Sequence, residues 1–305
     1  MMKSVRFWGK AGLGTAWMLT KQSVVSFIDD DVLSRGASIA FYAVTSIPPT
    51  LVIVIAIGGV IFSNATAQGA IIAQLSNVIG PQSAQYLQSV IQNAAGKSTG
   101  VIATVIGLAT LVITASGVFS EMKAALNIIW KTHPRGNAIT RFMKTRAASL
   151  GLVMGLGFLL LISLAIGAVV AALDPYITAD LPFGQSVLSL LNFSVSFCLG
   201  SVLFASIYKI LPDADIKWHD VIVGAVVTAF LFEVGKWLVS LYLGSGAISS
   251  SYGTAGGLIV LLLWIYFSAQ IFLLGAEFTK AYAENPRRRT DAPAVPISDN
   301  NPEHE

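Results

Sequence analysis

The chain has 305 residues, of which 54% are apolar and 11% are charged, and its formal net charge is +3 at pH 7. Soluble domains carry about 25% charged residues, so this composition, with a mean hydropathy of +0.72, excludes an ordinary soluble domain and predicts a polytopic helical membrane protein. The small positive charge does not favour nucleic-acid binding, and the single cysteine, Cys198, excludes a disulfide within the chain.

Residues 1–35 mix apolar side chains at helical spacing with tryptophans and basic residues. This pattern predicts a cytoplasmic N-terminal helix that lies in the membrane interface. Asp29, Asp30 and Asp31 end the run. We interpret them as a solvated charge cluster at a turn, because consecutive residues point in different directions. A metal site is the alternative interpretation.

The first transmembrane span is expected at 36–62, and Pro48–Pro49 interrupts it. Proline removes a backbone donor and disfavours helical geometry at the preceding residue, so we expect the helix to kink or break there. In a membrane the freed carbonyls need protein or water partners. Tyr42, Thr45 and Ser46 lie one turn away and could supply them.

A polar connection, 63–99, follows the first span and contains two amphipathic patches at 70–79 and 86–91, separated by Gly80–Pro81. We expect short extracytoplasmic helices on the membrane surface. Five further apolar runs predict spans at 100–120, 147–173, 187–210, 221–243 and 256–282. The predicted fold is therefore all-α: a bundle of six transmembrane helices within 36–284, with a disordered cytoplasmic tail at 285–305.

The basic residues predict the orientation of these spans. With six spans, the basic residues next to the first span, in the 121–146 loop, at Lys209 and Lys217, and in the tail all fall on one side. The opposite side holds only Lys97. The positive-inside rule therefore places both termini in the cytoplasm.

Among the polar residues of the last two spans, we single out Glu233 and Lys236 on the fifth, and Gln270 and Glu277 on the sixth. A charge near the middle of a membrane helix costs about 2.5–3.5 kcal/mol on insertion scales, so it needs a partner or an aqueous cavity. Glu277 lies close enough to the end of its helix to reach the interface, whereas Glu233 does not. The Glu233–Lys236 pair is either a structural intrahelical pair or a substrate or proton site that faces a cavity.

The break between these two spans, GSGAISSSYGTAGG, carries no charge. Backbone amides at its end, near Gly256 and Gly257, could hold an anionic group. The fourth span adds Asn192 on a stripe of small and polar residues. The candidate substrate pathway therefore comprises eight residues: Tyr42, Asn192, Glu233, Lys236, Gly256, Gly257, Gln270 and Glu277.

The three histidines, His133, His219 and His304, show no ligand spacing, so we predict no metal site. Phosphate-loop and dinucleotide-binding fingerprints are also absent from the sequence. We therefore expect no cofactor and no catalytic residue.

Four stretches resemble one bacterial family. They are RGASIAFYAVTSIPP (35–49), ALNIIW (125–130), LPDADIKWHDVIVGA (211–225) and the run from FLFEVGKWLVSLY to the end of the sixth span at 230–283. Together they resemble the YihY/BrkB family of bacterial inner-membrane proteins over about residues 15–284. The resemblance implies six transmembrane helices in the cytoplasmic membrane. The family has carried a ribonuclease BN label, a serum-resistance label and proposals of transport.

These observations favour a transporter or flippase-like factor for an amphipathic, lipid-like or anionic envelope compound. The alternative is a scaffold that supports envelope assembly without transport. A membrane-tethered ribonuclease is a third interpretation, which the residues oppose because no catalytic carboxylate cluster lies in a cytosolic loop. We expect membrane lipids as partners, leave a homo-oligomer open, and expect no nucleic acid.

Overall fold

The computed structural model describes residues 5–61, 68–69, 71–73, 76, 80–95, 117–132, 151, 155, 184–244 and 256–285. These residues are helical apart from short turns and loops, and they contain no strand. The labelled helices are α1 (Val5–Asp29), α2 (Val32–Ile61), α4 (Pro81–Ala95), α7 (Gly184–Ile210), α8 (Trp218–Gly244) and α10 (Gly256–Ala283). A further helical segment covers 117–129. The predicted all-α class is confirmed.

Within the described residues, three stretches are long and apolar enough to cross a membrane: Phe193–Ile210, Trp218–Val239 and Gly256–Ala283. They coincide with the predicted spans at 187–210, 221–243 and 256–282. A further apolar helical stretch, Val32–Ile47, belongs to the predicted first span. Most of the predicted second and third spans and all but the first residue of the tail lie outside the described residues, so the number of six spans stays a prediction.

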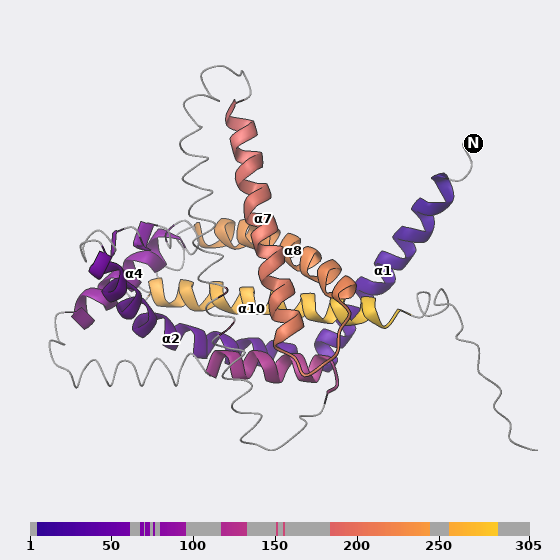
Figure 1. Ribbon diagram of the computed structural model, residues 1–305, viewed down its shortest axis with the longest axis horizontal. Coiled ribbons are helices and arrows are strands. Elements are labelled where there is room, and N and C mark those ends of the chain that lie inside the picture. The colour runs from indigo at the N-terminus through magenta and orange to yellow at the C-terminus, as the bar shows by residue number, and fades with distance from the viewer. Residues whose placement is uncertain are drawn as a thin grey trace, which may run out of the picture.

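Helix α10 is the central helix of the described structure. It contacts α1, α2, α4 and α8, while α7 packs against α8 (Figure 1). Figure 1 shows α7 crossing the other helices steeply, with its N-terminal half extending away from them. Burial follows this arrangement, because Phe204 and Tyr208 in the C-terminal half of α7 are buried whereas Leu190 and Phe193 are exposed.

Glycines allow α8 and α10 to approach closely. A Cβ added at Gly224 would overlap the side chain of Thr279, and one added at Gly275 would overlap Thr228 and the Tyr208 hydroxyl. Small residues at helix contacts are typical of membrane bundles, since lipid supplies no hydrophobic force between helices. The close approach brings polar groups of three helices together in the core.

Tyr208 provides the polar link between α7, α8 and α10. Its hydroxyl donates to the Phe272 carbonyl at 2.6 Å and lies 3.0 Å from the Thr228 Oγ1. The Tyr208 and Phe272 rings stack with their centroids 5.3 Å apart. A buried hydroxyl without such partners would cost about 1–3 kcal/mol, so this contact fixes how the three helices meet.

Of the kink or break expected in the first span, the structure excludes the break, and the kink stays a prediction. Helix α2 continues through Pro48 and Pro49 as one helix from Val32 to Ile61. Nearby hydroxyls bond back to the backbone: Thr45 Oγ1 lies 3.0 Å from the Phe41 carbonyl and Ser46 Oγ lies 2.9 Å from the Ala43 carbonyl. Neighbouring turns thus remain helical even though each proline removes a backbone donor.

Helix α1 turns an apolar stripe away from the rest of the protein. Leu19 and Ser23 are buried on its inner side, whereas Trp17 is 73% exposed and Ile28 is 66% exposed. Asp31 takes a left-handed conformation with φ of 50°, which aspartate tolerates better than most residues, and the chain turns there into α2. An outward apolar stripe suits the predicted interfacial helix, whose location in a membrane stays a prediction.

The predicted amphipathic patch at 86–91 lies within α4, which contacts α2 and α10. Gly80 precedes the helix with φ of 84°, and Pro81 occupies the first helical position, where its missing N–H costs nothing. Leu87 and Ile91 are buried in a hydrophobic cluster that also contains Leu51 of α2 and Leu261 of α10. Much of the patch predicted at 70–79 lies outside the described residues.

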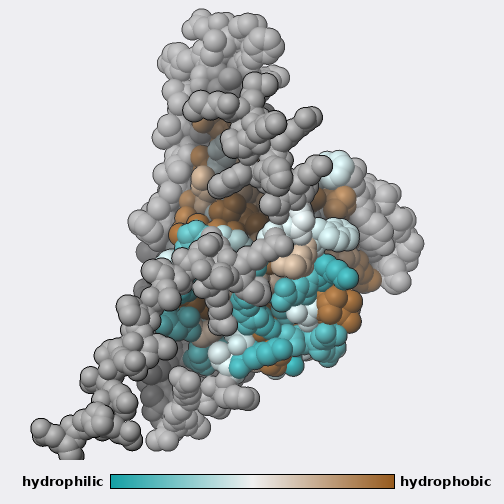
Figure 2. Space-filling model, turned by 90° about the vertical axis from the view of Figure 1, so that its right-hand side faces the viewer, coloured by the Kyte–Doolittle hydropathy of each residue, from teal (hydrophilic) through white to brown (hydrophobic). Residues whose placement is uncertain are grey.

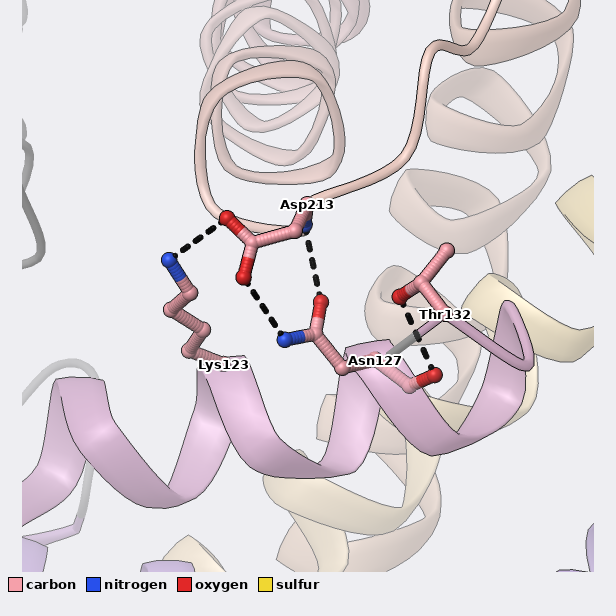
Figure 3. A network of polar contacts seen from close by, with 4 residues as sticks. All are labelled: Lys123, Asn127, Thr132 and Asp213. Carbon is pink, nitrogen blue, oxygen red and sulfur yellow. Dashed lines mark hydrogen bonds and ion pairs between the residues drawn. The ribbon is translucent and has the colours of Figure 1, made fainter. Parts of the chain in front are cut away.

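A polar clamp joins the 117–129 segment to the loop between α7 and α8 (Figure 3). The Asn127 side chain donates to Asp213 Oδ2 at 3.0 Å and accepts from the Asp213 backbone N–H at 2.8 Å. Lys123 Nζ donates to Asp213 Oδ1 at 2.8 Å. The clamp therefore connects the ALNIIW and LPDADIKWHD stretches, which are far apart in sequence.

We predict that Gly275→Ala lowers the free energy of unfolding by about 1–3 kcal/mol, because the added methyl group overpacks the contact with Thr228 and Tyr208. Gly200→Ala is the matched control, since the nearest atom to its added Cβ is 3.9 Å away. Thermal unfolding of the purified proteins in detergent, followed by circular dichroism, measures the difference. Equal melting temperatures of the two variants would contradict the packing account.

We also predict that Asn127→Ala destabilises the protein by about 1–3 kcal/mol, because it removes the two hydrogen bonds that the Asn127 side chain makes with the Asp213 N–H and Oδ2. The same melting measurement tests this variant. Asp215→Asn is the control on the same loop. The Asp215 side chain is fully exposed and lies 3.6 Å from Lys209, so its replacement leaves the melting temperature unchanged. A larger effect at Asp215 than at Asn127 would refute the assignment of the clamp.

Candidate functional site

Glu233 and Lys236 form an ion pair on α8, with Lys236 Nζ 2.7 Å from Glu233 Oε1. At 1.5 Å per residue, Glu233 lies about 23 Å from the start of α8 and about 17 Å from its end, near the middle of the helix. The Lys236 and Glu233 side chains are 35% and 19% exposed, and Trp237 beside them is 63% exposed. The pair therefore lies at the edge of the contact between α8 and α10. It does not lie in the interior of that contact.

A narrow groove runs beside this pair, between α8 and α10. Its lining is mostly apolar and aromatic: Phe232, Gly235, Lys236, Val239, Trp264, Phe267, Ser268 and Ile271. The Lys236 ammonium lies 5.8 Å from the centre of the Phe232 ring. The space open to water in this groove is about 10 Å³, room for about one water molecule, whereas small-molecule pockets usually occupy about 300–1,000 Å³. The groove is therefore a shallow apolar surface feature and not a cavity that encloses a ligand.

Gln270 faces a different neighbour, the first turns of α2. Its Nε2 donates to the Leu33 carbonyl at 3.1 Å, and a Cβ added at Gly36 would overlap its side chain. Its Oε1 is buried without a hydrogen-bond partner among the described residues. Gln270 therefore joins α10 to α2 and does not reach the groove next to Lys236.

The remaining predicted pathway residues lie elsewhere. Tyr42 packs against Gly117, where an added Cβ would overlap its ring. Gly256 and Gly257 are buried at the start of α10, about 30 Å along the helix axis from Glu277 at 1.5 Å per residue. Asn192 belongs to α7, and its side chain lies outside the described set. The eight residues therefore do not form one pathway within the described structure.

Glu277 corrects a prediction. Its residue is 1% exposed, so it does not extend to the interface. It borders a second, polar pocket with about 100 Å³ of space open to water, lined by Gln22, Ser26, Lys131, Glu277, Lys280, Ala281 and Glu284. Neither of its carboxylate oxygens has a hydrogen-bond donor among the described residues.

Asp30, from the turn between α1 and α2, faces Glu277. Its Oδ2 is buried, has no hydrogen-bond donor among the described residues, and lies 3.9 Å from Lys280 Nζ. That separation is within ion-pair range but too long for a hydrogen bond. Asp30 is thus drawn against α10, which corrects the interpretation of all three aspartates as solvated.

Hydrophilic side chains gather at this end of the structure, as Figure 2 shows. The exposed charged residues there come from the α1–α2 turn, the α7–α8 loop and the end of α10: Asp29, Asp31, Asp213, Asp215, Lys217 and Glu284. The described structure therefore has two candidate sites: an apolar groove halfway along α8 and a polar pocket at this end.

Sequence reasoning missed Asp30, Lys131 and Lys280. The spacing of Glu277 and Lys280 places both on one side of α10, and this signal could have identified the pair. Nothing local to Asp30 or Lys131 indicates that they meet α10, because only the tertiary packing brings them there. Among the described residues, no three His, Cys, Asp or Glu side chains gather as metal ligands would.

Comparisons with known proteins identify the family. The profile described as Virulence factor BrkB matches residues 23–298. A UPF0761 membrane protein of Alkalilimnicola ehrlichii is 26% identical over 262 residues, covering 84% of this chain and 56% of the relative. Another, from Pseudoalteromonas translucida, is 26% identical over 286 residues, covering 93% and 90%. A third, from Tolumonas auensis, is 34% identical over 194 residues, covering 61% and 60%.

No solved structure matches the chain. The chain spans 56% of the Alkalilimnicola relative and 46% of a similar Psychrobacter protein, so it corresponds to about half of those longer chains. The profile match covers most of the chain, and these relatives are named as membrane proteins. Together with the three apolar helices able to cross a membrane, they establish the chain as an integral membrane protein of the BrkB family.

Proposed function

We propose that this protein moves an amphipathic, anionic envelope compound across the bacterial inner membrane. The observation that carries the proposal is the groove between α8 and α10, whose lining combines aromatic and aliphatic side chains with Lys236. The apolar lining offers a contact surface to an acyl segment, and a lysine halfway along a span attracts a negatively charged head group. Intramembrane ionisable residues of this kind mark substrate pathways in transporters.

The ion pair suits such a role because Glu233 holds Lys236 in the absence of substrate. A phosphate or carboxylate that reaches Lys236 replaces the Glu233 carboxylate as its partner, so the lysine stays neutralised throughout. A permanently unpaired lysine at this depth would be costly. Glu233 is then the group without a partner, so the contact between the substrate and Lys236 has to offset that cost.

The charge distribution supports an orientation for this transport. Lys123 and Lys209 contact the α7–α8 loop, and Lys217 belongs to that loop. Lys131 and Lys280 line the polar pocket, and Arg35 lies in the first turn of α2. The described part of the opposite end, residues 80–95 and the start of α10, carries no charge. By the positive-inside rule, the hydrophilic end faces the cytoplasm.

Cysteine labelling tests this orientation. In a Cys198→Ser background, we expect Gln85→Cys on α4 to react with an impermeant maleimide in intact cells. Asp215→Cys should react only after the inner membrane is permeabilised. Both positions are exposed in the structure, so each is a control for the reactivity of the other. Labelling of position 215 from outside would invert the topology.

Liposome flux tests the transport. We expect purified protein in vesicles to accelerate transbilayer movement of a fluorescent anionic phospholipid, measured by chemical quenching of the outer leaflet. Lys236→Ala leaves the Glu233 carboxylate unpaired and lowers stability by about 1–3 kcal/mol. Glu233→Gln combined with Lys236→Met removes both charges, so we expect it to recover stability and to remain inactive in flux.

The possible outcomes distinguish the candidate functions. A stable double variant with normal flux would show that the pair serves only structure. Wild-type protein without flux of this lipid or of soluble anions would favour a scaffold for envelope assembly. Metal-dependent RNA cleavage by the same preparation would favour a nuclease, if a mock preparation without the protein does not cleave RNA.

A further inference from the structure

Two carboxyl groups face each other beside the polar pocket at the hydrophilic end, without a hydrogen-bond donor between them among the described residues. Glu277 is contributed by α10 and Asp30 by the turn that links α1 to α2. Both Glu277 oxygens and Asp30 Oδ2 are buried and lack a hydrogen-bond donor among the described residues, and Glu277 is 1% exposed. Hydrogen bonds normally stabilise a buried carboxylate, and these oxygens receive none.

The charged neighbours do not supply the missing donor. Lys280 Nζ is 3.9 Å from Asp30 Oδ2, which permits electrostatic attraction but no hydrogen bond. Lys131, from the end of the 117–129 segment, and Glu284, one turn beyond Lys280, also line the pocket. With all these groups ionised, three carboxylates face two ammonium groups. One positive charge is therefore missing.

We propose that Asp30 and Glu277 form a proton-binding site in which the two carboxyl groups share one proton. A proton on either group converts it into a hydrogen-bond donor to the other and removes the repulsion between like charges. It also balances the charge of the pocket with Lys280 and Lys131. The pocket, which reaches Lys131 and Glu284 at the surface, gives water a route for proton exchange.

The position of Asp30 gives this proton a structural effect. Asp30 lies where α1 ends and α2 begins, whereas Glu277 is fixed in the central helix. With the proton present, a hydrogen bond draws the turn onto α10. Without it, two like charges repel one another across the contact, and the turn shifts towards water. The site therefore links proton binding to the docking of α1 and α2.

Infrared spectroscopy of the purified protein at neutral pH tests the site, because exposed Asp and Glu side chains, with ordinary pKa values near 4, are then ionised. We expect wild-type protein to show the carbonyl stretch of a neutral carboxylic acid, and to lose it when the pH is raised. Glu277→Gln should fold and lack the band, since its amide replaces the protonated group as donor. Glu284→Gln, an exposed position on the same pocket, is the matched control and should retain the band.

Asp30→Asn provides a second variant and tests the sharing itself. Its amide supplies a donor to Glu277, so the proton is no longer required and the band should disappear. Retention of the band in Asp30→Asn would assign the proton to Glu277 alone, and retention in Glu277→Gln or absence from the wild type would exclude the site. The readout does not use transport, so a protein that shows the band without lipid flux retains this site and loses the proposed function.

Discussion

The close contact between α8 and α10 is the constraint on which the rest of the described structure depends. Gly224 and Gly275 leave room for Thr279, Thr228 and the Tyr208 hydroxyl, and this last group ties α7 to both helices. The other faces of α10 then contact α1, α2 and α4. A change in the spacing of α8 and α10 would therefore move the groove beside Lys236. It would also shift the surface on which Asp30 docks.

Composition and hydrophobic run length predict the helical class and the bounds of the last three spans, because the bilayer itself imposes them. The same reasoning gave a kink or a break at Pro48–Pro49, and the structure excludes the break. That expectation counted the two lost backbone donors and the non-helical preference of the residue before a proline. It did not count the neighbouring turns, which remain helical in α2. Local rules give the cost of a proline pair, whereas its outcome depends on the surrounding helix.

The candidate sites show where sequence reasoning ends. The Glu233–Lys236 contact could be predicted because both partners lie on one helix at fixed spacing. The spacing also places Gln270 and Glu277 on one face of α10, but it does not tell which helix that face meets. Glu277 meets Asp30 more than 200 residues away in sequence, and Gln270 meets Leu33. These pairings are set by packing, which residue patterns alone do not encode.

Helix α2 has a mechanical property that its continuity conceals. Pro48 and Pro49 have no backbone N–H to donate to the carbonyls of Val44 and Thr45. Two successive backbone hydrogen bonds are therefore missing in the middle of the helix. The N-terminal part is held by the Gln270 contact with Leu33, and the helix also contacts α4. Bending α2 at the prolines breaks fewer bonds than bending it elsewhere. Among the described helices α2 alone has proline in its interior. The middle of α2 therefore resists bending less than the middle of any other described helix.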